Sequence, residues 1–271
     1  MIGAIIGDIA GSRFEFNNHR SKDFKFFHRK CEYTDDSVMT IAVGLAILDC
    51  QGDYTPLGEK AVSRMREFGQ RHYDAGYGEG FYNWLFRANP QPYNSCGNGA
   101  AMRISAVGFA ARTLEECKEM SRKVTEVTHN HPDGIRGAEA TAVAIFMARH
   151  GASIPEIRSV FTKEYYPIDF TIDEIRPVYE WGALCSNTVP QALEAFFESA
   201  GYEDAIRNAI SIGGDSDTIA AITGGIAEAY YGVPDDLREE AMRYLTPDLK
   251  EAMQAFEMAF PWKKPERPEE A

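Results

Sequence analysis

The run from Val38 to Leu48, V-M-T-I-A-V-G-L-A-I-L, constrains the fold of this chain more than any other segment. Its residues are apolar nearly all round a helical projection, and they lack the alternation of a half-buried strand. Such a helix is stable only when other parts of the chain cover every side of it. The run therefore predicts a central helix buried inside the domain.

Signals that begin or end helices recur along most of the chain. Pro132 and Pro247 suit the first turn of a helix, while Gly151 and Gly201 suit the residue just past a helix end. Ser or Thr followed three residues later by Glu or Gln forms a capping box, which satisfies two free N–H groups at a helix start. Four such pairs occur: Thr113/Glu116, Ser153/Glu156, Thr171/Glu174 and Thr188/Gln191.

Signals for strands are weak by comparison. The best candidates, residues 24–27 and 165–170, are short and are interrupted by Lys25 or by Pro167. We therefore predict an all-α chain that forms a single compact helical domain over residues 1–260, without a large sheet. Residues 261–271 have the charged, proline-rich composition of a loose C-terminal tail.

The charge balance restricts the partners of the protein. The 271 residues include 28 Lys and Arg against 41 Asp and Glu, a formal net charge of −13. A chain this acidic is repelled by phosphate backbones and anionic lipid, so general binding to nucleic acid or membranes is disfavoured. Five cysteines without a C-x-x-C pair suit reduced thiols, and Asp8 arrives too early for a signal peptide. We expect a soluble, cytoplasmic protein that is a monomer.

Two segments place acidic residues directly before apolar helices. Thr34-Asp35-Asp36-Ser37 precedes the central run, and Asp215-Ser216-Asp217-Thr218 precedes a second apolar stretch. Helix capping explains either segment alone about as well as a metal site does, because Asp and Thr are common caps. Taken together, the segments crowd like charges that are costly to desolvate unless a cation neutralises them.

Oxygen ligands without nearby Cys or His suit Mg²⁺, Mn²⁺ or Ca²⁺ rather than zinc. Two such clusters brought together are able to hold two metals, with some carboxylates bridging them. Glu15, in the glycine-punctuated segment G-D-I-A-G-S-R-F-E, is a third acid. Taken alone, Glu15 is equally explained as a surface residue.

Two loops have features of an anion site. In N-S-C-G-N-G, residues 94–99, Gly97 and Gly99 allow successive N–H groups to point one way before an apolar helix, although a simple turn also explains them. In T-H-N-H-P-D, residues 128–133, one imidazole is suited to bind a phosphate or ribose, and a structural histidine is the alternative. The two histidines lack the further partners that a zinc site needs.

These motifs, in this order, resemble those of the ADP-ribosylglycohydrolase family. The resemblance rests on G-D-I-A-G-S-R-F-E, T-D-D-S, S-C-G-N-G-A-A-M-R, T-H-N-H-P-D and G-G-D-S-D-T-I-A-A-I-T-G-G-I-A-E-A-Y-Y-G, and it runs from about Met1 to Gly232. It implies an orthogonal all-α fold with a binuclear Mg²⁺ or Mn²⁺ centre at the base of an ADP-ribose cleft.

The resemblance also assigns roles to residues of this chain. Glu15 matches an acid near the metals and the scissile bond, and with Asp36 and Asp217 it forms the expected catalytic set. His129 matches a histidine that contacts the ligand. The implied metal ligands are Thr34, Asp35, Asp36, Asp215, Asp217 and Thr218. The implied loop around the diphosphate and distal ribose is Ser95, Cys96, Gly97, Asn98 and Gly99.

The function implied is hydrolysis of the glycosidic bond between ADP-ribose and an acceptor, with arginine of a protein as the first candidate. The sequence leaves the acceptor open among arginine, serine, a nucleobase and a free ADP-ribose derivative. Two alternatives are a metal-dependent phosphohydrolase of small nucleotides and a non-catalytic module that binds ADP-ribose. The complete set of carboxylates favours an enzyme over such a module.

Overall fold

The computed structural model describes residues 1–267 and shows an all-α protein. Within this range the backbone forms no strand, only one isolated antiparallel bridge between Gly97 and Leu184. The prediction of a single compact helical domain is confirmed. The helices are α1 (Ile2–Ser12), α2 (Asp35–Asp49), α3 (Leu57–Arg71), α4 (Glu79–Phe86), α5 (Gly99–Met102), α6 (Ser105–Ala110), α7 (Leu114–Thr125), α8 (Pro132–Arg149), α9 (Ile154–Glu164), α10 (Ile172–Ile175), the 3-10 helix η1 (Cys185–Asn187), α11 (Val189–Phe197), α12 (Tyr202–Ile212), α13 (Ser216–Tyr231), α14 (Asp235–Ala241) and α15 (Pro247–Ala259).

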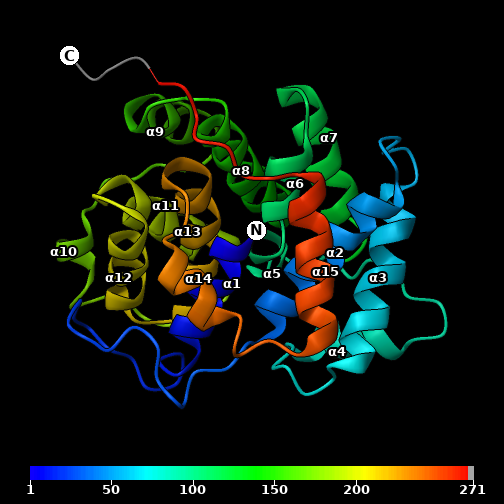
Figure 1. Cartoon of the computed structure of the whole chain (residues 1–271), viewed down its shortest axis with the longest axis horizontal. Helices are drawn as coiled ribbons and strands as arrows, with labels where there is room; N and C mark the ends of the chain where they lie inside the picture. Colours follow the sequence, from blue (N-terminus) through cyan, green and yellow to red (C-terminus); the bar gives the residue numbers. More distant parts are fainter. Residues whose placement is uncertain (268–271) are drawn as a thin grey trace.

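Three helices form the centre of the molecule. In Figure 1, α1 lies between the group of α11, α12 and α13 on one side and the group of α2, α3 and α15 on the other. The predicted central helix is α2, whose residues from Val38 to Gly44 are all buried. α13 is buried over its whole length except Tyr231. Because most of each of α1, α2 and α13 is buried, packing holds the three helices in fixed positions relative to one another.

α1 and α13 pack with their backbones almost in contact. Gly3, Gly7 and Gly11 recur every four residues, so they form a stripe on the α13 side of α1. A Cβ atom on Gly7 would lie only 2.0 Å from the carbonyl oxygen of Ala220, and one on Gly3 only 2.4 Å from that of Gly224. No side chain fits there, so the stripe sets the distance between the two helices.

Most of the predicted helix ends are found where the sequence places them. Ser153/Glu156 and Thr171/Glu174 form complete capping boxes, and the Thr113 hydroxyl accepts a hydrogen bond from the N–H of Glu116. Pro132 and Pro247 occupy first turns, and Gly151 follows α8 with a φ of 88°.

Two predicted helix ends are wrong. Gly201 precedes α12 in an extended conformation instead of ending a helix. The side chain of Thr188 does not cap α11; its hydroxyl accepts a hydrogen bond from the Asn98 amide at 3.2 Å and donates one to the carbonyl oxygen of Gly182 at 3.4 Å. Tertiary contacts therefore override the local capping signal at Thr188.

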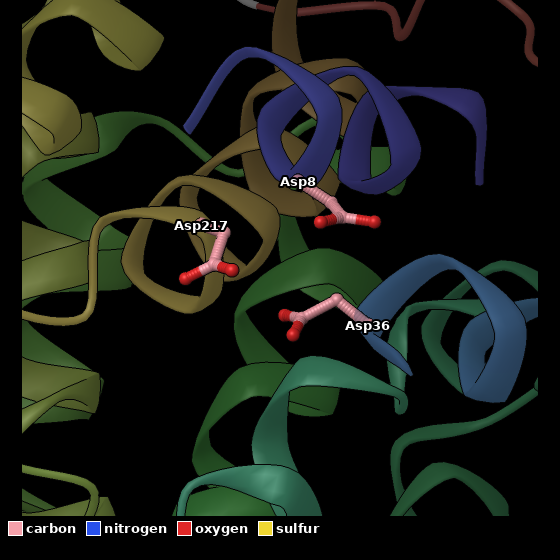
Figure 2. Close-up of side chains that lie close together, drawn as sticks. All are labelled: Asp8, Asp36 and Asp217. Carbon is pink, nitrogen blue, oxygen red and sulfur yellow. The ribbon is translucent and has the colours of Figure 1, made fainter. Parts of the chain in front are cut away.

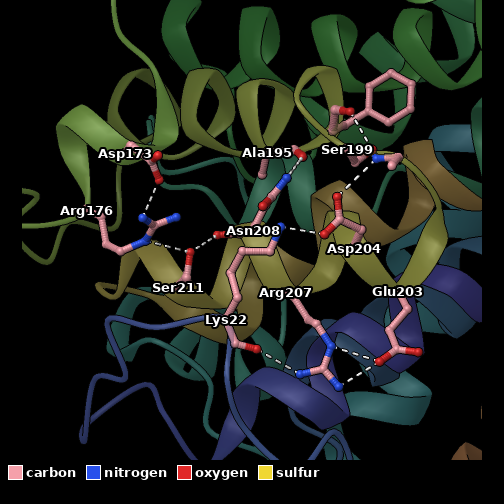
Figure 3. A network of polar contacts seen from close by, with 12 residues as sticks. Lys22, Asp173, Arg176, Ala195, Ser199, Glu203, Asp204, Arg207, Asn208 and Ser211 are labelled. Carbon is pink, nitrogen blue, oxygen red and sulfur yellow. Dashed lines mark hydrogen bonds and ion pairs between the residues drawn. The ribbon is translucent and has the colours of Figure 1, made fainter.

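The long connection between α1 and α2, residues 13–34, has no regular structure. It includes residues 24–27, the weak strand candidate of the sequence, which form no strand. It is held against α12 by polar contacts (Figure 3). Arg207 donates to the carbonyl oxygen of Lys22 at 2.9 Å and pairs with Glu203, while the Lys22 ammonium pairs with Asp204. These contacts fix residues 13–34, the segment that contains Glu15.

The described part of the C-terminal segment, residues 261–267, has no regular structure but lies against the domain. The Arg267 guanidinium donates to the carbonyl oxygen of Ala148 at 3.1 Å, and the Trp262 indole donates to that of Ala229 at 3.4 Å. This part is therefore not the loose end that its composition predicts. The rest of the predicted tail, residues 268–271, lies outside the described residues. Across residues 1–267 we find no helix with the length and apolar character needed to cross a membrane.

Gly7→Ala tests the contact between α1 and α13. The added methyl group overlaps the backbone of α13, so we expect a loss of roughly 1–3 kcal/mol or more in the free energy of unfolding, measured by urea denaturation. Gly58→Ala in α3 is the matched control, because its Cβ would lie 3.4 Å from the nearest atom, at ordinary contact distance. That control should be neutral or stabilising by up to about 1 kcal/mol. Equal stability of the two variants would contradict the steric account.

Candidate active site

Three helices bring buried carboxylates to one place. Asp8 comes from α1, Asp36 from α2 and Asp217 from α13, and one oxygen of each lies within 4.8 Å of the others. Figure 2 shows the three side chains pointing toward one another from separate helices. A second group with the same spacing shares Asp217 and adds Glu15 and Asp215. The two acidic segments that the sequence predicts to meet therefore do meet.

Asp8 is a site residue that the sequence analysis missed. Its carboxylate accepts hydrogen bonds from the N–H groups of Thr34 at 2.9 Å and Ser37 at 3.1 Å, and from the hydroxyl groups of both residues. Asp8 thus satisfies N–H groups at the start of α2 from a different helix. The only signal for it is an acid directly after Gly7 in an otherwise apolar helix.

One hydrogen bond joins the two acidic segments, and another joins the second segment to the glycine loop. Thr218 donates through its hydroxyl to Asp36 at 3.2 Å, and Asp215 accepts from the side-chain amide of Asn98 at 2.7 Å. Capping explains Thr34, whose side chain accepts from the N–H of Asp36 at 3.3 Å. It does not explain Asp215, which stands at the N-cap position of α13 without capping it.

The buried carboxylates repel one another. Burial, followed by the charges of neighbouring acids, raises the pKa of Asp35, Asp36 and Asp217 well above the usual range. Burial also raises the pKa of Glu15 to about 7 and that of Asp8 to about 6. Among residues 1–267, none of these carboxylates is paired with a Lys, Arg or His side chain.

The donor set fits divalent cations. Oδ1 of Asp36 is buried and has no hydrogen-bond partner among residues 1–267, which is costly unless another group compensates it. The donors around it are carboxylate and hydroxyl oxygens, the ligands that Mg²⁺ and Mn²⁺ prefer. The identity and number of the ions stay predictions.

A cavity of about 460 Å³ opens beside the carboxylates and contains most of the predicted site. Of the predicted residues only Cys96 does not line it; its carbonyl oxygen accepts from the N–H of Cys185 at 3.0 Å. The predicted residues that line the cavity are Glu15, Thr34, Asp35, Asp36, Ser95, Gly97, Asn98, Gly99, His129, Asp215, Asp217 and Thr218.

The glycine loop does not have the predicted form. The N–H of Asn98 already donates to the carbonyl oxygen of Ala183 at 2.8 Å, so the loop does not present a continuous series of free N–H groups. Instead, Gly97 and Gly99 leave space: Cβ atoms there would lie 3.6 and 3.4 Å from Nε2 of His129. The apolar helix predicted after the loop is also interrupted, because α5 ends at Met102 and α6 begins three residues later.

The two histidines of T-H-N-H-P-D have separate roles. His129 is buried at the cavity wall, and its pKa lies well below the usual value because of burial and the nearby Arg103. His131 caps α8 by accepting a hydrogen bond from the N–H of Asp133 at 3.1 Å.

Several residues of the cavity wall were missed by the sequence analysis. They include Glu79, Tyr93, Arg103 and Trp181. Arg103 belongs to a motif that carries the resemblance, but nothing in its spacing indicates that it reaches the cavity. The other three come from loops or helix starts without a motif, and only tertiary structure brings them here.

Comparison with known proteins decides the family. The model of the ADP-ribosylglycohydrolase family matches residues 1–265. The chain belongs to the ADP-ribosylglycohydrolase family. The resemblance of the five motifs is confirmed, and so is the prediction that this family member is a glycohydrolase enzyme.

Characterised relatives are similar over most of their length. The ADP-ribosylhydrolase ARH3 of Xenopus tropicalis is 25% identical, with 86% of each chain covered, and that of Homo sapiens is 24% identical, with 92% of this chain and 90% of the human protein covered. The ADP-ribosylarginine hydrolase Tri1 of Pseudomonas putida is 25% identical, with 86% of this chain and 70% of Tri1 covered. A solved structure described as an ADP-ribosylglycohydrolase-related protein complex shares the fold, with a TM-score of 0.69 and 21% identity over 96% of this chain and 94% of that chain.

Asp36→Asn tests whether the cluster binds cations. The amide removes one negative charge and still accepts the hydrogen bond from Thr218, so the metal-free variant should be more stable than the wild type by roughly 1–3 kcal/mol at about pH 8. It should also gain much less stability from added Mg²⁺, as measured by thermal shift. Equal Mg²⁺ stabilisation of both proteins would remove Asp36 from the proposed ligand set.

The raised pKa values predict how cation binding depends on pH. A carboxyl group with a raised folded-state pKa stabilises the fold below its unfolded pKa, and it loses that contribution as pH rises through the folded pKa. For Glu15, with a folded pKa of about 7 against 4.5, metal-free protein loses this contribution between about pH 4.5 and pH 7. Protons and cations compete for the same oxygens, so the rise in Tm caused by Mg²⁺ should be larger at about pH 8 than at about pH 5. At each pH the Tm with Mg²⁺ is compared with the Tm without it, which cancels the contribution of carboxylates elsewhere in the protein. An equal rise in Tm at both pH values would contradict the assignment.

Proposed function

We propose that this protein is a metal-dependent hydrolase that cleaves the glycosidic bond between ADP-ribose and an acceptor, with arginine as the acceptor. The observation that carries the proposal is the unpaired carboxylate cluster at one side of a cavity large enough for a small ligand. Membership of the ADP-ribosylglycohydrolase family supports the ligand class.

Two divalent cations are the proposed cofactors. Asp36, Asp217 and Thr218 would hold them together with Thr34, Asp35 and Asp215, and the unpartnered Oδ1 of Asp36 supports this assignment. When bound, such cations orient hydroxyl groups of a sugar and lower the pKa of a water molecule. Asp8 holds the start of α2 in place behind them.

Glu15 is the proposed acid or base of the reaction. It lies at the cavity wall beside Asp217, where a carboxyl group is able to accept a proton from water or donate one to the leaving group. The neighbouring aspartates are less suited to donate a proton, because bound cations would keep them ionised. As the bond to the acceptor breaks, positive charge on the ribose would be stabilised by the nearby carboxylates.

The glycine loop is the proposed site of the diphosphate and the distal ribose. Ser95, Gly97 and Gly99 leave space for the ligand, and His129 offers a ring nitrogen toward that space. Asn98 links this loop to the acidic cluster, because its amide donates to Asp215.

Arginine is proposed as the acceptor on two grounds. Glu79, an exposed carboxylate at the cavity wall, would attract a guanidinium group, and one relative is named an ADP-ribosylarginine hydrolase. Cytoplasmic localisation, a monomeric state and the absence of general nucleic-acid binding stay predictions from the sequence.

The test is incubation with defined peptides carrying ADP-ribose on arginine or on serine, in Mg²⁺ and in EDTA, with products identified by mass. We expect free ADP-ribose with an intact diphosphate, faster release from arginine, and little release in EDTA. Glu15→Gln should reduce turnover by at least about a hundredfold while ADP-ribose still binds. Release of AMP would indicate a phosphohydrolase instead, and full turnover by metal-stripped protein would refute the metal requirement.

A further inference from the structure

Arg103 is a fully buried arginine without an acidic partner. It lies at the end of α5, is 1% exposed and lines the cavity. Within residues 1–267 it forms no ion pair, and its Nε has no hydrogen-bond partner. A guanidinium group is rarely buried so completely without an ionic partner, because removing its charge from water is costly. Burial lowers the pKa of Arg103 only to about 10, so the side chain is charged at neutral pH.

The shortest hydrogen bond of Arg103 leads toward His129, and a longer one of 3.5 Å joins its Nη2 to the carbonyl oxygen of Val124. Its Nη2 donates to the Thr128 hydroxyl at 2.6 Å and lies 3.4 Å from Nδ1 of His129. The Thr128 hydroxyl is 2.7 Å from the same Nδ1. The three side chains therefore form a buried chain of polar contacts that ends on one nitrogen of the imidazole.

This arrangement determines which nitrogen of His129 carries the proton. Arg103 is a donor only, so Thr128 accepts from it and has its own proton free for Nδ1. A proton on Nδ1 would face the guanidinium donor and would leave the Thr128 proton without an acceptor. The neutral imidazole is therefore protonated on Nε2, the atom that faces the positions of Gly97 and Gly99.

We propose that Arg103 is a positioning residue: acting through Thr128, it holds His129 as a neutral imidazole whose Nε2–H donates to an oxygen of the anionic ligand at the glycine loop. The identity of that ligand as ADP-ribose rests on the proposed function. The protonation of His129 does not, because it follows from contacts within the protein.

Nitrogen NMR of histidine-labelled protein tests the proposal without any ligand. The chain has six histidines, and His129→Gln identifies the signals of His129 by their loss. In the wild type at neutral pH we expect an unprotonated Nδ1 and a protonated Nε2. Thr128→Val should shift both signals toward the averaged values of two exchanging tautomers, and Thr128→Ser should restore them. A wild-type His129 protonated on Nδ1, or unchanged signals in Thr128→Val, would overturn the proposal.

Arg103→Met removes the charge while keeping an unbranched apolar side chain, and it should shift the His129 signals in the same way. Arg122→Met is the matched control, because Arg122 is exposed on α7 and, among residues 1–267, pairs only with Glu126. If Arg103→Met does not fold, the comparison of Thr128→Val with Thr128→Ser still tests the proposal.

Calorimetry with ADP-ribose then tests the link to binding. In Mg²⁺ we expect Thr128→Val and Arg103→Met each to lose roughly tenfold in affinity, and Thr128→Ser to stay within about twofold of the wild type. Altered His129 signals with unchanged affinity would overturn the role in ligand binding. If the wild type does not bind ADP-ribose at all, the proposed function fails, while the NMR result still decides how His129 is held.

Discussion

The close packing of α1 against α13 is the constraint on which the site depends. Because Gly7 lets the backbones of the two helices approach, the next residue of α1, Asp8, is carried to the start of α2. α13 in turn begins at the same place and contributes Asp217. A larger residue at position 7 would separate the helices, and the carboxylates of Asp8, Asp36 and Asp217 would no longer lie within 4.8 Å of one another. The geometry of the acidic cluster is therefore set by glycines that carry no functional group.

The cluster is unfavourable for the stability of the fold. In the described part of the chain these carboxylates have no cationic partner and one oxygen of Asp36 has no hydrogen bond, so the carboxylates raise one another's pKa. Three almost completely buried helices hold these groups together, so their separation would expose the apolar core. Cations that bind the cluster would relieve the repulsion, and in this way binding and stability are coupled.

The sequence was sufficient to predict the helical class, the buried α2 and the meeting of the two acidic segments. These features follow from local patterns: apolar periodicity, caps, and carboxylates beside apolar helices. Asp8 was missed because its partners lie more than twenty residues away, at the start of another helix. Thr188 was misread as a cap because the structure uses its hydroxyl to bind Asn98. Such errors arise where tertiary contacts replace a local role, and here they lie next to the cavity.

Charges of both signs line the cavity. Glu15 and the aspartates contribute negative charge, while Arg103 supplies a positive charge next to His129. Such charges are screened less than on an exposed surface, so the anionic part of a ligand would be attracted toward Arg103 and repelled by the carboxylates. Asn98 links the acidic cluster to the glycine loop: its amide donates to Asp215, and the glycines on either side of it face His129. A change in the position of this loop would therefore alter the acidic cluster and the proposed anion site together, because both depend on Asn98.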